Sequence, residues 1–299
     1  MLFRILGPPD LYDETGDRST PLNAPKTRLL LGTLLTRPNV PVPRETLVRE
    51  LWGTAPPRQA PHTLNAHVSA LRASLLRVEP ERRQSSRLVA RASGYALLAR
   101  PSETDVGRFG RALSGARRTA AHDPEGTYRA LRRGLALWRG PVLGGGAHGP
   151  ACARLAARLE RERQDALALY FDCALRTRRH AQAVPELQDA TAAHPLDERL
   201  HDQLMLALCR CGRGPEAIGV YQRARRRLAA VNGHTPLLTA RLEQISVCSP
   251  VLTDPAAEHP GPGPSRREPA RYETPADPLP RSVLGYLTDV LSGQVLSSS

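Results

Sequence analysis

The sequence predicts a mostly helical chain with small β elements, and three observations support this class. Apolar residues recur at helical spacing over much of residues 25–77 and 105–248. Short stretches of alternating apolar residues, bounded by turn residues, occur near residues 1–24 and 87–98. The length of 299 residues leaves room for two domains at roughly 150 residues each. We therefore expect one small mixed domain followed by an all-helical one.

The first 24 residues predict short strands and a hairpin. Phe3, Ile5 and Leu11 alternate around the turn 7–10, and the polar loop 13–17 follows. A first helix is expected from Pro25, which suits the first helical position, until Pro38 ends the run of leucines.

Two further helices and a second hairpin complete the first domain. After the extended connection 40–43, residues 44–52 predict a short helix that Gly53 ends. Residues 59–77 predict the longest helix, with an apolar stripe of Leu64, Val68, Leu71 and Leu75. Residues 87–98 alternate around a break at Gly94. Strands, three helices and a terminal hairpin are typical of a winged helix-turn-helix, which we assign to residues 1–100.

The helical part, residues 105–248, carries a repeat. Residues 179–184 realign with residues 213–218 at an offset of 34, the tetratricopeptide period. Leu187 then falls on Tyr221 and Ala190 on Ala224, as stacked helix pairs require. Chance similarity between helices rich in Ala and Arg is the alternative, because only two copies align well. We expect a tetratricopeptide-like all-helical domain here.

Residues 249–299 form a Pro-rich tail. Nine prolines fall within residues 249–280, a composition that buries too little apolar surface to offset the entropy of ordering. The tail is therefore expected to be disordered.

Charge favours a polyanionic partner. The chain holds 42 Lys and Arg against 29 Asp and Glu, a net charge of +13, and Lys26 is its single lysine. Residues 1–100 carry 15 basic and 8 acidic side chains, and residues 251–299 carry 4 and 6. The positive field therefore lies on the first 250 residues. Charge alone does not separate nucleic acid from other partners, because GC-rich genomes raise arginine content everywhere.

The compartment follows from cysteine usage and hydropathy. Five scattered cysteines do not make the disulfide framework of a small secreted domain. No stretch is apolar for long enough to span a membrane, and the start lacks the pattern of a secretion signal. We expect a cytoplasmic protein with no membrane partner.

The helix at 59–77 offers the candidate nucleic-acid interface. Its apolar stripe faces inward, so the opposite face points to solvent or to DNA. Three alanines lie on that opposite face, where a helix that is only solvated would favour charges. A solvated face remains the alternative. The outward residues are His62, Ala66, Ser69, Ala70, Ala73 and Arg77, and Asn65, His67 and Arg72 lie on the flanks.

Arg91 is a second candidate contact. It stands at the tip of the predicted hairpin beside Gly94, where a guanidinium could enter an adjacent minor groove. An ordinary exposed arginine is the alternative.

Catalytic, metal and cofactor sites are not expected. Cys209 and Cys211 lie near His201, but the second ligand pair of a closed zinc site is missing. The glycines 144–146 are not followed by the Lys and Ser or Thr of a phosphate-binding loop. No nucleophile motif appears in a suitable context. We expect no enzyme activity and no cofactor.

Several strings resemble the Streptomyces antibiotic regulatory protein family. In the first half, which is similar to an OmpR-type winged helix, these are residues 3–8, 25–31, 51–53, 64–72 and 94–95. In the second half, which is similar to the family's bacterial transcriptional activation domain, they are residues 136–141, 193–199 and 203–208. The resemblance covers roughly residues 1–250.

The resemblance implies a transcriptional activator of a secondary-metabolite, or antibiotic, gene cluster. Such an activator would bind double-stranded DNA at tandem direct repeats as a dimer and recruit RNA polymerase. It would place Ala66 and Ala70 at base-reading positions and Arg91 at the position of the wing arginine. Phosphate contacts would fall to Thr63, His67, Ser69 and Arg72.

One departure and one alternative accompany this interpretation. Relatives often carry a long side chain where Ala70 stands, so hydrogen bonds to bases would be sparse and readout of DNA shape larger. The alternative function is a tetratricopeptide-like scaffold that binds a protein, with the basic N-terminal domain as an accessory.

Overall fold

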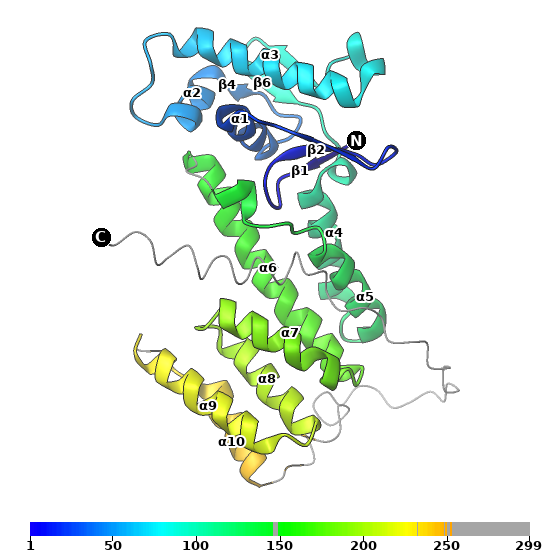
Figure 1. The fold of residues 1–299 in the computed structure, drawn as a ribbon, viewed down its shortest axis with the longest axis vertical. Helices are drawn as coiled ribbons and strands as arrows, with labels where there is room; N and C mark the ends of the chain where they lie inside the picture. Colours follow the sequence, from blue (N-terminus) through cyan, green and yellow to red (C-terminus); the bar gives the residue numbers. More distant parts are fainter. Residues whose placement is uncertain (146–148, 232, 248, 250–251, 253–299) are drawn as a thin grey trace. The chain divides into compact units, whose positions relative to one another are not determined.

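The structure is a computed structural model that describes residues 1–145, 149–231, 233–247, 249 and 252 (Figure 1). The chain forms two compact units. Unit 1 holds residues 1–114 and 137–164, and unit 2 holds residues 115–136 and the described residues from 165 onward. The predicted class is confirmed: the chain is mostly helical, with a winged helix-turn-helix followed by a tetratricopeptide-like helical part.

Unit 1 begins with a three-stranded antiparallel sheet. It consists of β1 (Leu2–Arg4), β2 (Asp10–Asp13) and β3 (Arg18–Pro21), in that order. Phe3 pairs with Leu11 in the register, and both side chains are buried. The alternation of apolar residues therefore predicts this sheet correctly.

Three helices follow, namely α1 (Pro25–Leu35), α2 (Arg44–Trp52) and α3 (Ala60–Val78). Prolines lie in the first turns of α1 and α3, where the missing N–H costs no hydrogen bond. The stripe of Leu64, Val68, Leu71 and Leu75 is buried as the helical period predicts.

The second sheet has the strand order β4-β6-β5, with β4 (Val42–Pro43), β5 (Leu88–Arg91) and β6 (Gly94–Leu97). A short 3-10 helix, Pro80–Arg83, leads from α3 to β5. The connection that the sequence predicts as merely extended is the edge strand β4. Gly94 has φ of +153°, and a Cβ there would lie 1.9 Å from the carbonyl oxygen of Val42. Glycine at this position therefore lets β4 lie against the wing hairpin.

Residues 137–164 belong to unit 1, where they bond to the connection between β1 and β2 and pack against its helices. The backbone N–H of Arg139 donates to Leu6 O at 2.7 Å, and that of Leu143 donates to Ile5 O at 2.9 Å. The ring of Trp138 meets the ring of Phe109 edge to face, 5.4 Å between centroids. The elements involved are the 3-10 helices Pro101–Glu103 and Val142–Gly145, the helix α4 (Asp105–Thr119), and the start of α6 (Pro150–Arg176).

Glu50 of α2 caps the first turn of α6. Its Oε1 accepts from the N–H of Ala151 at 2.8 Å, and its Oε2 accepts from the N–H of Cys152 at 3.3 Å. Glu50 is only 5% exposed. The four N–H groups at the start of a helix have no partner within the helix, and a carboxylate there also meets the positive end of the helix dipole. A carboxylate of the winged helix therefore anchors the first helix turn after residue 149.

Unit 2 is helical throughout its described residues. Its elements are α5 (Pro124–Leu135), α7 (His180–Ala193), α8 (Glu198–Arg210), α9 (Gly214–Ala229) and α10 (Pro236–Ser246), together with the end of α4 and the second half of α6. The helix α8 packs against α7, α9 and α10. The recurring positions at the 34-residue offset, Leu187 with Tyr221 and Ala190 with Ala224, are buried in both helices.

The predicted domain bounds, residues 1–100 and 105–248, stay a prediction, and the compact units group the residues differently. The predicted disordered tail, residues 249–299, lies outside the described residues apart from Ser249 and Leu252. None of the helices in the described part of the chain is both long enough and apolar enough to cross a membrane.

Candidate nucleic-acid interface

The face of α3 opposite its buried stripe is open to solvent. All six residues expected to point outward are exposed: His62, Ala66, Ser69, Ala70, Ala73 and Arg77. Four of these six have side chains no larger than that of serine, so the backbone of α3 is accessible along this face. Another molecule could therefore approach the helix closely here.

The flanks of this face are held by hydrogen bonds. Asn65 is exposed, whereas Thr63, His67 and Arg72 are half-buried. The hydroxyl of Thr63 donates to Gln59 O at 3.1 Å, one turn earlier. The flanking side chains thus have structural partners within unit 1 in addition to any role toward DNA.

His67 joins α3 to α1 and α2. Its Nδ1 lies 3.2 Å from the hydroxyl oxygen of Thr27, and its ring centroid lies 6.1 Å from that of Trp52. Burial lowers the pKa of His67, and the positive charge of Lys26 lowers it further. Both effects favour the neutral form of the imidazole.

Tyr95 of β6 lies at the junction of the wing with α2 and α3. Its hydroxyl donates to Asn65 Oδ1 at 3.0 Å, and Arg44 Nη2 lies 3.4 Å from the same hydroxyl. The guanidinium carbons of Arg44 and Arg72 lie 5.2 and 5.9 Å from the ring centroid. Tyr95 itself is only 5% exposed. One buried aromatic ring therefore positions three polar side chains beside the exposed face of α3.

Arg72 has a second structural contact. Its Nε donates to the carbonyl oxygen of Leu88, in the first strand of the wing, at 3.1 Å. Arg72 thus joins α3 to the wing as well as bearing a positive charge. A substitution at Arg72 would change the wing and the charge together.

Arg91 is exposed at the end of β5, where it pairs in register with Gly94 across the two-residue turn. The turn residues Ala92 and Ser93 are exposed as well. The structure therefore presents Arg91 at the tip of the wing.

Arg44 is a candidate that the sequence argument missed. It is exposed at the first position of α2, and its guanidinium lies over Tyr95. The sequence did offer a signal for Arg44. It follows Pro43 at the start of a helix, where a positive charge opposes the helix dipole, so the arginine does not serve helix stability there.

Not every arginine in the first hundred residues contributes to a positive surface. Arg87 is buried and forms two-pronged ion pairs, at 2.6 and 2.7 Å with Glu79 and at 2.9 Å twice with Glu103. These bonds lower the pKa of Glu103 to about 2. Arg4 pairs with Asp10 in the first sheet. The exposed arginines near α3 and the wing, rather than the total count, define the field that DNA would meet.

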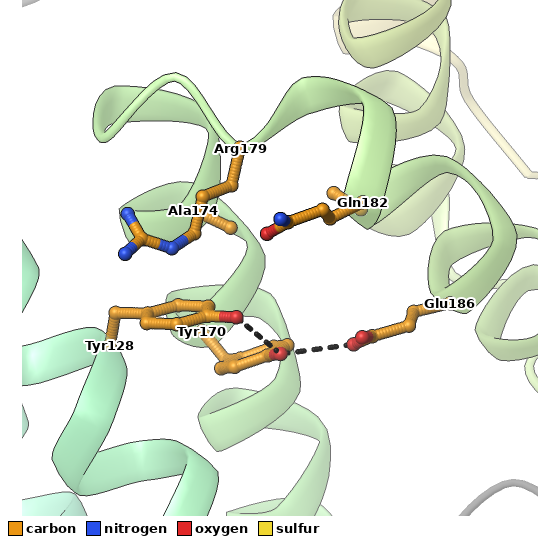
Figure 2. A pocket seen from close by; sticks show the side chains of 7 residues that line it. Tyr128, Tyr170, Ala174, Arg179, Gln182 and Glu186 are labelled. Carbon is orange, nitrogen blue, oxygen red and sulfur yellow. Dashed lines mark hydrogen bonds between the residues drawn. The ribbon is translucent and has the colours of Figure 1, made fainter. Parts of the chain in front are cut away.

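Unit 2 contains a small hollow between α5, α6 and α7, lined by aromatic and polar side chains (Figure 2). The rings of Tyr128 and Tyr170 stack at 4.8 Å between centroids, and the Tyr170 hydroxyl donates to Glu186 at 3.0 Å. Arg179 lies over the Tyr128 ring and pairs with Glu125 at 2.8 Å. These groups satisfy one another, so the hollow is a packed polar junction.

Of the three residues weighed as metal ligands, His201 bonds to the backbone. His201 Nε2 lies 3.1 Å from Pro195 O, and Cys209 and Cys211 are free thiols. Within the residues that the structure describes, no cluster of three or more His, Cys, Asp or Glu side chains could hold a metal ion.

Two family models match the chain. Residues 20–97 match "Transcriptional regulatory protein, C terminal", and residues 104–244 match "Bacterial transcriptional activator domain". The first match includes α3 and the wing, and the second includes the helices of unit 2.

Relatives extend over both halves. The chain is 34% identical to the transcriptional regulator RedD of Streptomyces coelicolor, over 85% of this chain and 73% of RedD. It is 32% identical to the regulatory protein DnrI of Streptomyces peucetius, over 88% of this chain and 96% of DnrI.

A solved structure has a similar fold. The chain of Mycobacterium tuberculosis EmbR, solved in complex with a low affinity phosphopeptide, matches with a TM-score of 0.75 and 29% identity. The match covers 86% of this chain and 67% of that one. Taken together, the two matched domains and the relatives that span them show that the chain belongs to the Streptomyces antibiotic regulatory protein family of transcription regulators.

Proposed function

We propose that the chain is a sequence-specific activator that binds DNA through the exposed face of α3 and the tip of the wing. The observation that carries this proposal is the exposed row of small side chains on α3, backed by a fully buried apolar stripe. The major groove admits an α-helix, and small residues let its backbone approach the base edges closely.

Base contacts and phosphate contacts divide between the centre and the edges of this surface. Ala66 and Ala70 meet base edges and thymine methyl groups, since alanine offers only apolar contact. Ser69, Thr63, His67 and Arg72 meet the phosphates that border the groove, with Asn65, His62, Ala73 and Arg77 along the same helix face. Few of these side chains can make paired hydrogen bonds to a base, so sequence-dependent DNA shape contributes much of the specificity.

Arg91 enters the minor groove beside the major-groove site. A narrow minor groove concentrates negative potential and attracts a guanidinium. The exposed position of Arg91 at the end of β5 supports this role.

Two copies bind tandem direct repeats head to tail. Repeats about one helical turn apart present two α3 helices to the same side of the duplex. The second half of each chain then recruits RNA polymerase to promoters of an antibiotic biosynthesis cluster. The match to an activator domain and the similarity to RedD and DnrI support this part of the proposal.

The full chain should be used in the test, because residues 137–164 are part of unit 1. Selection of binding sites from a random duplex pool, followed by footprinting, would identify the target. The proposal expects two copies of one motif in the same orientation, spaced by about one helical turn. A single site, an inverted repeat, or no enrichment would contradict it, and no enrichment would favour the protein-binding scaffold.

A further inference from the structure

The solvent face of α9 carries an arginine surface, defined here as Arg223, Arg226 and Arg227. These residues are three and four positions apart, so they are neighbours on one side of the helix. The opposite side of α9 is buried through Ala217, Val220, Tyr221, Ala224 and Leu228. The three arginines are all exposed.

No carboxylate neutralises this surface within the part of the chain that the structure describes. Glu216 is the single acidic residue of α9, and it pairs with Arg213 at 2.6 Å. Arg226 donates only to the carbonyl oxygen of Gln222, one turn earlier. Other exposed arginines of unit 2 differ in this respect, because Arg117 pairs with Asp165 and Arg129 pairs with Glu125.

The neighbouring helix α8 does not supply the missing negative charge. Asp202 pairs with Arg241 of α10 at 2.8 Å. Asp197 caps α8 by accepting from the N–H groups of Arg199 and Leu200, and Glu198 accepts from the N–H of Leu238.

The positive field reaches the interior of unit 2. Burial lowers the pKa of His201 in α8. The charges of Arg227 and Arg223 lower it as well, against the Pro195 carbonyl and Asp197, which raise it. Like charges three and four residues apart also destabilise the helix that carries them. Among the described residues, none forms an ion pair with these three arginines, so α9 carries three like charges on one face at a cost in stability.

The side chains between the arginines are small or polar. Gly219, Gln222 and Ala230 share this face, and the Arg223 guanidinium lies over Gly219, 3.2 Å from where a Cβ would stand. The centres of protein interfaces combine arginine with aromatic residues and methionine, and this face has arginines but no aromatic residue and no methionine. Guanidinium groups without apolar anchors suit a row of phosphates.

We propose that the arginine surface of α9 is a second DNA-binding surface, which contacts the phosphate backbone without reading sequence. It lies in unit 2 and is separate from the α3 face, although the choice of duplex DNA among polyanions rests on the proposed function. Such a surface would add affinity for any duplex while leaving the preference for the target unchanged.

The test measures binding of the full chain to a labelled duplex of unrelated sequence over a range of salt concentrations. The variant R223Q/R226Q/R227Q removes the surface. The control R117Q/R129Q/R213Q removes the same charge from the same unit, but from arginines that are paired with carboxylates. Each phosphate contact contributes about 0.9 to the slope of log affinity against log salt. The α9 variant should therefore lose affinity roughly ten-fold or more at moderate salt and lower the slope by roughly 2 to 3.

The outcomes separate the possibilities. The proposal holds if the α9 variant weakens binding and the control does not, while melting temperature is unchanged or higher because like-charge repulsion is relieved. An equal loss of affinity in both variants would show that only the net charge matters, and this would overturn the proposal. Unchanged DNA binding combined with weaker transcription by purified RNA polymerase would overturn it in favour of an acidic protein partner. The substitution A70E should abolish the preference for the selected target yet keep the part of the salt slope that α9 supplies. Failure of the proposed function of α3 can therefore be distinguished from failure of the α9 proposal.

Discussion

The Tyr95 hydroxyl donates a hydrogen bond to Asn65 Oδ1 at 3.0 Å, which joins the wing to the exposed side of α3. Because Tyr95 is buried and also contacts Arg44 and Arg72, it fixes the rotation of α3 relative to the wing. The two surfaces proposed to enter adjacent grooves of DNA are thereby held in one geometry.

Removing this hydroxyl should weaken DNA binding as well as stability. Y95F should lower the free energy of unfolding by about 1 kcal/mol, the usual contribution of one hydrogen bond, and lower affinity for the selected target several-fold. Chemical denaturation and fluorescence anisotropy measure the two effects. The control is Y12F, which removes a hydroxyl that donates to Asp17 in an exposed turn. Equal affinities of Y95F and the unaltered chain would show that Tyr95 does not set the DNA-binding geometry.

Acid should destabilise unit 1 through the ion pairs of Arg87. The hydrogen bonds from Arg87 lower the pKa of Glu103 to about 2, and they also lower that of Glu79 although its burial acts to raise it. A carboxyl whose pKa is lower in the folded state stabilises the fold above its unfolded pKa and loses that contribution as the pH falls. This contribution is therefore complete above pH 4.5 and declines toward pH 2.

The variant E103Q isolates this effect. E103Q should lower the free energy of unfolding by about 1 to 3 kcal/mol at pH 6, and this difference from the parent should shrink as the pH falls below 4.5. Asp105 acts in the opposite direction, because burial raises its pKa to about 6, but its contribution is common to variant and parent. Thermal melts of both proteins between pH 3 and 7 provide the measurement, with D165N of an exposed ion pair as the control. A penalty for E103Q that does not change with pH would be inconsistent with the account.

Glu50 should be essential for joining α6 to the winged helix. E50A leaves the N–H groups of Ala151 and Cys152 without acceptors, and buried unsatisfied donors cost about 1 to 3 kcal/mol each. We expect the free energy of unfolding of unit 1 to fall by about 2 to 4 kcal/mol. Chemical denaturation measures this change. The control E45A removes an exposed carboxylate from the first turn of the same helix. If both variants unfold alike, Glu50 is not a structural cap.

Local periodicity explains which parts of the fold could be predicted from the sequence. Three features depend only on residues close together in the sequence, and the structure has each of them. They are the buried stripe on α3, the alternation of β1 and β2, and the 34-residue offset between α7 and α9. The exposed face of α3 followed from the same pattern, since a buried stripe leaves the other side outward.

Contacts between distant residues left no such pattern. The pairing of Val42 with Tyr95 joins residues far apart in the chain, and a two-residue strand has no periodicity to detect. Glu50 looked like one more surface charge of an amphipathic helix, because its partners lie a hundred residues later. Arg87 was counted toward the positive field, although both its carboxylate partners lie inside unit 1.

The most direct test of the central claim is a pair of matched substitutions on exposed helical alanines. A70E places a negative charge at the centre of the α3 face, and A157E makes the same change on the exposed side of α6 within unit 1. Affinity of the full chain for its selected duplex, with melting temperature measured in parallel, is the measurement. The account predicts that A70E loses specific binding by two orders of magnitude or more, about 3 kcal/mol, while A157E binds normally and both remain folded. Normal binding by A70E would contradict the assignment of α3 as the DNA-reading helix.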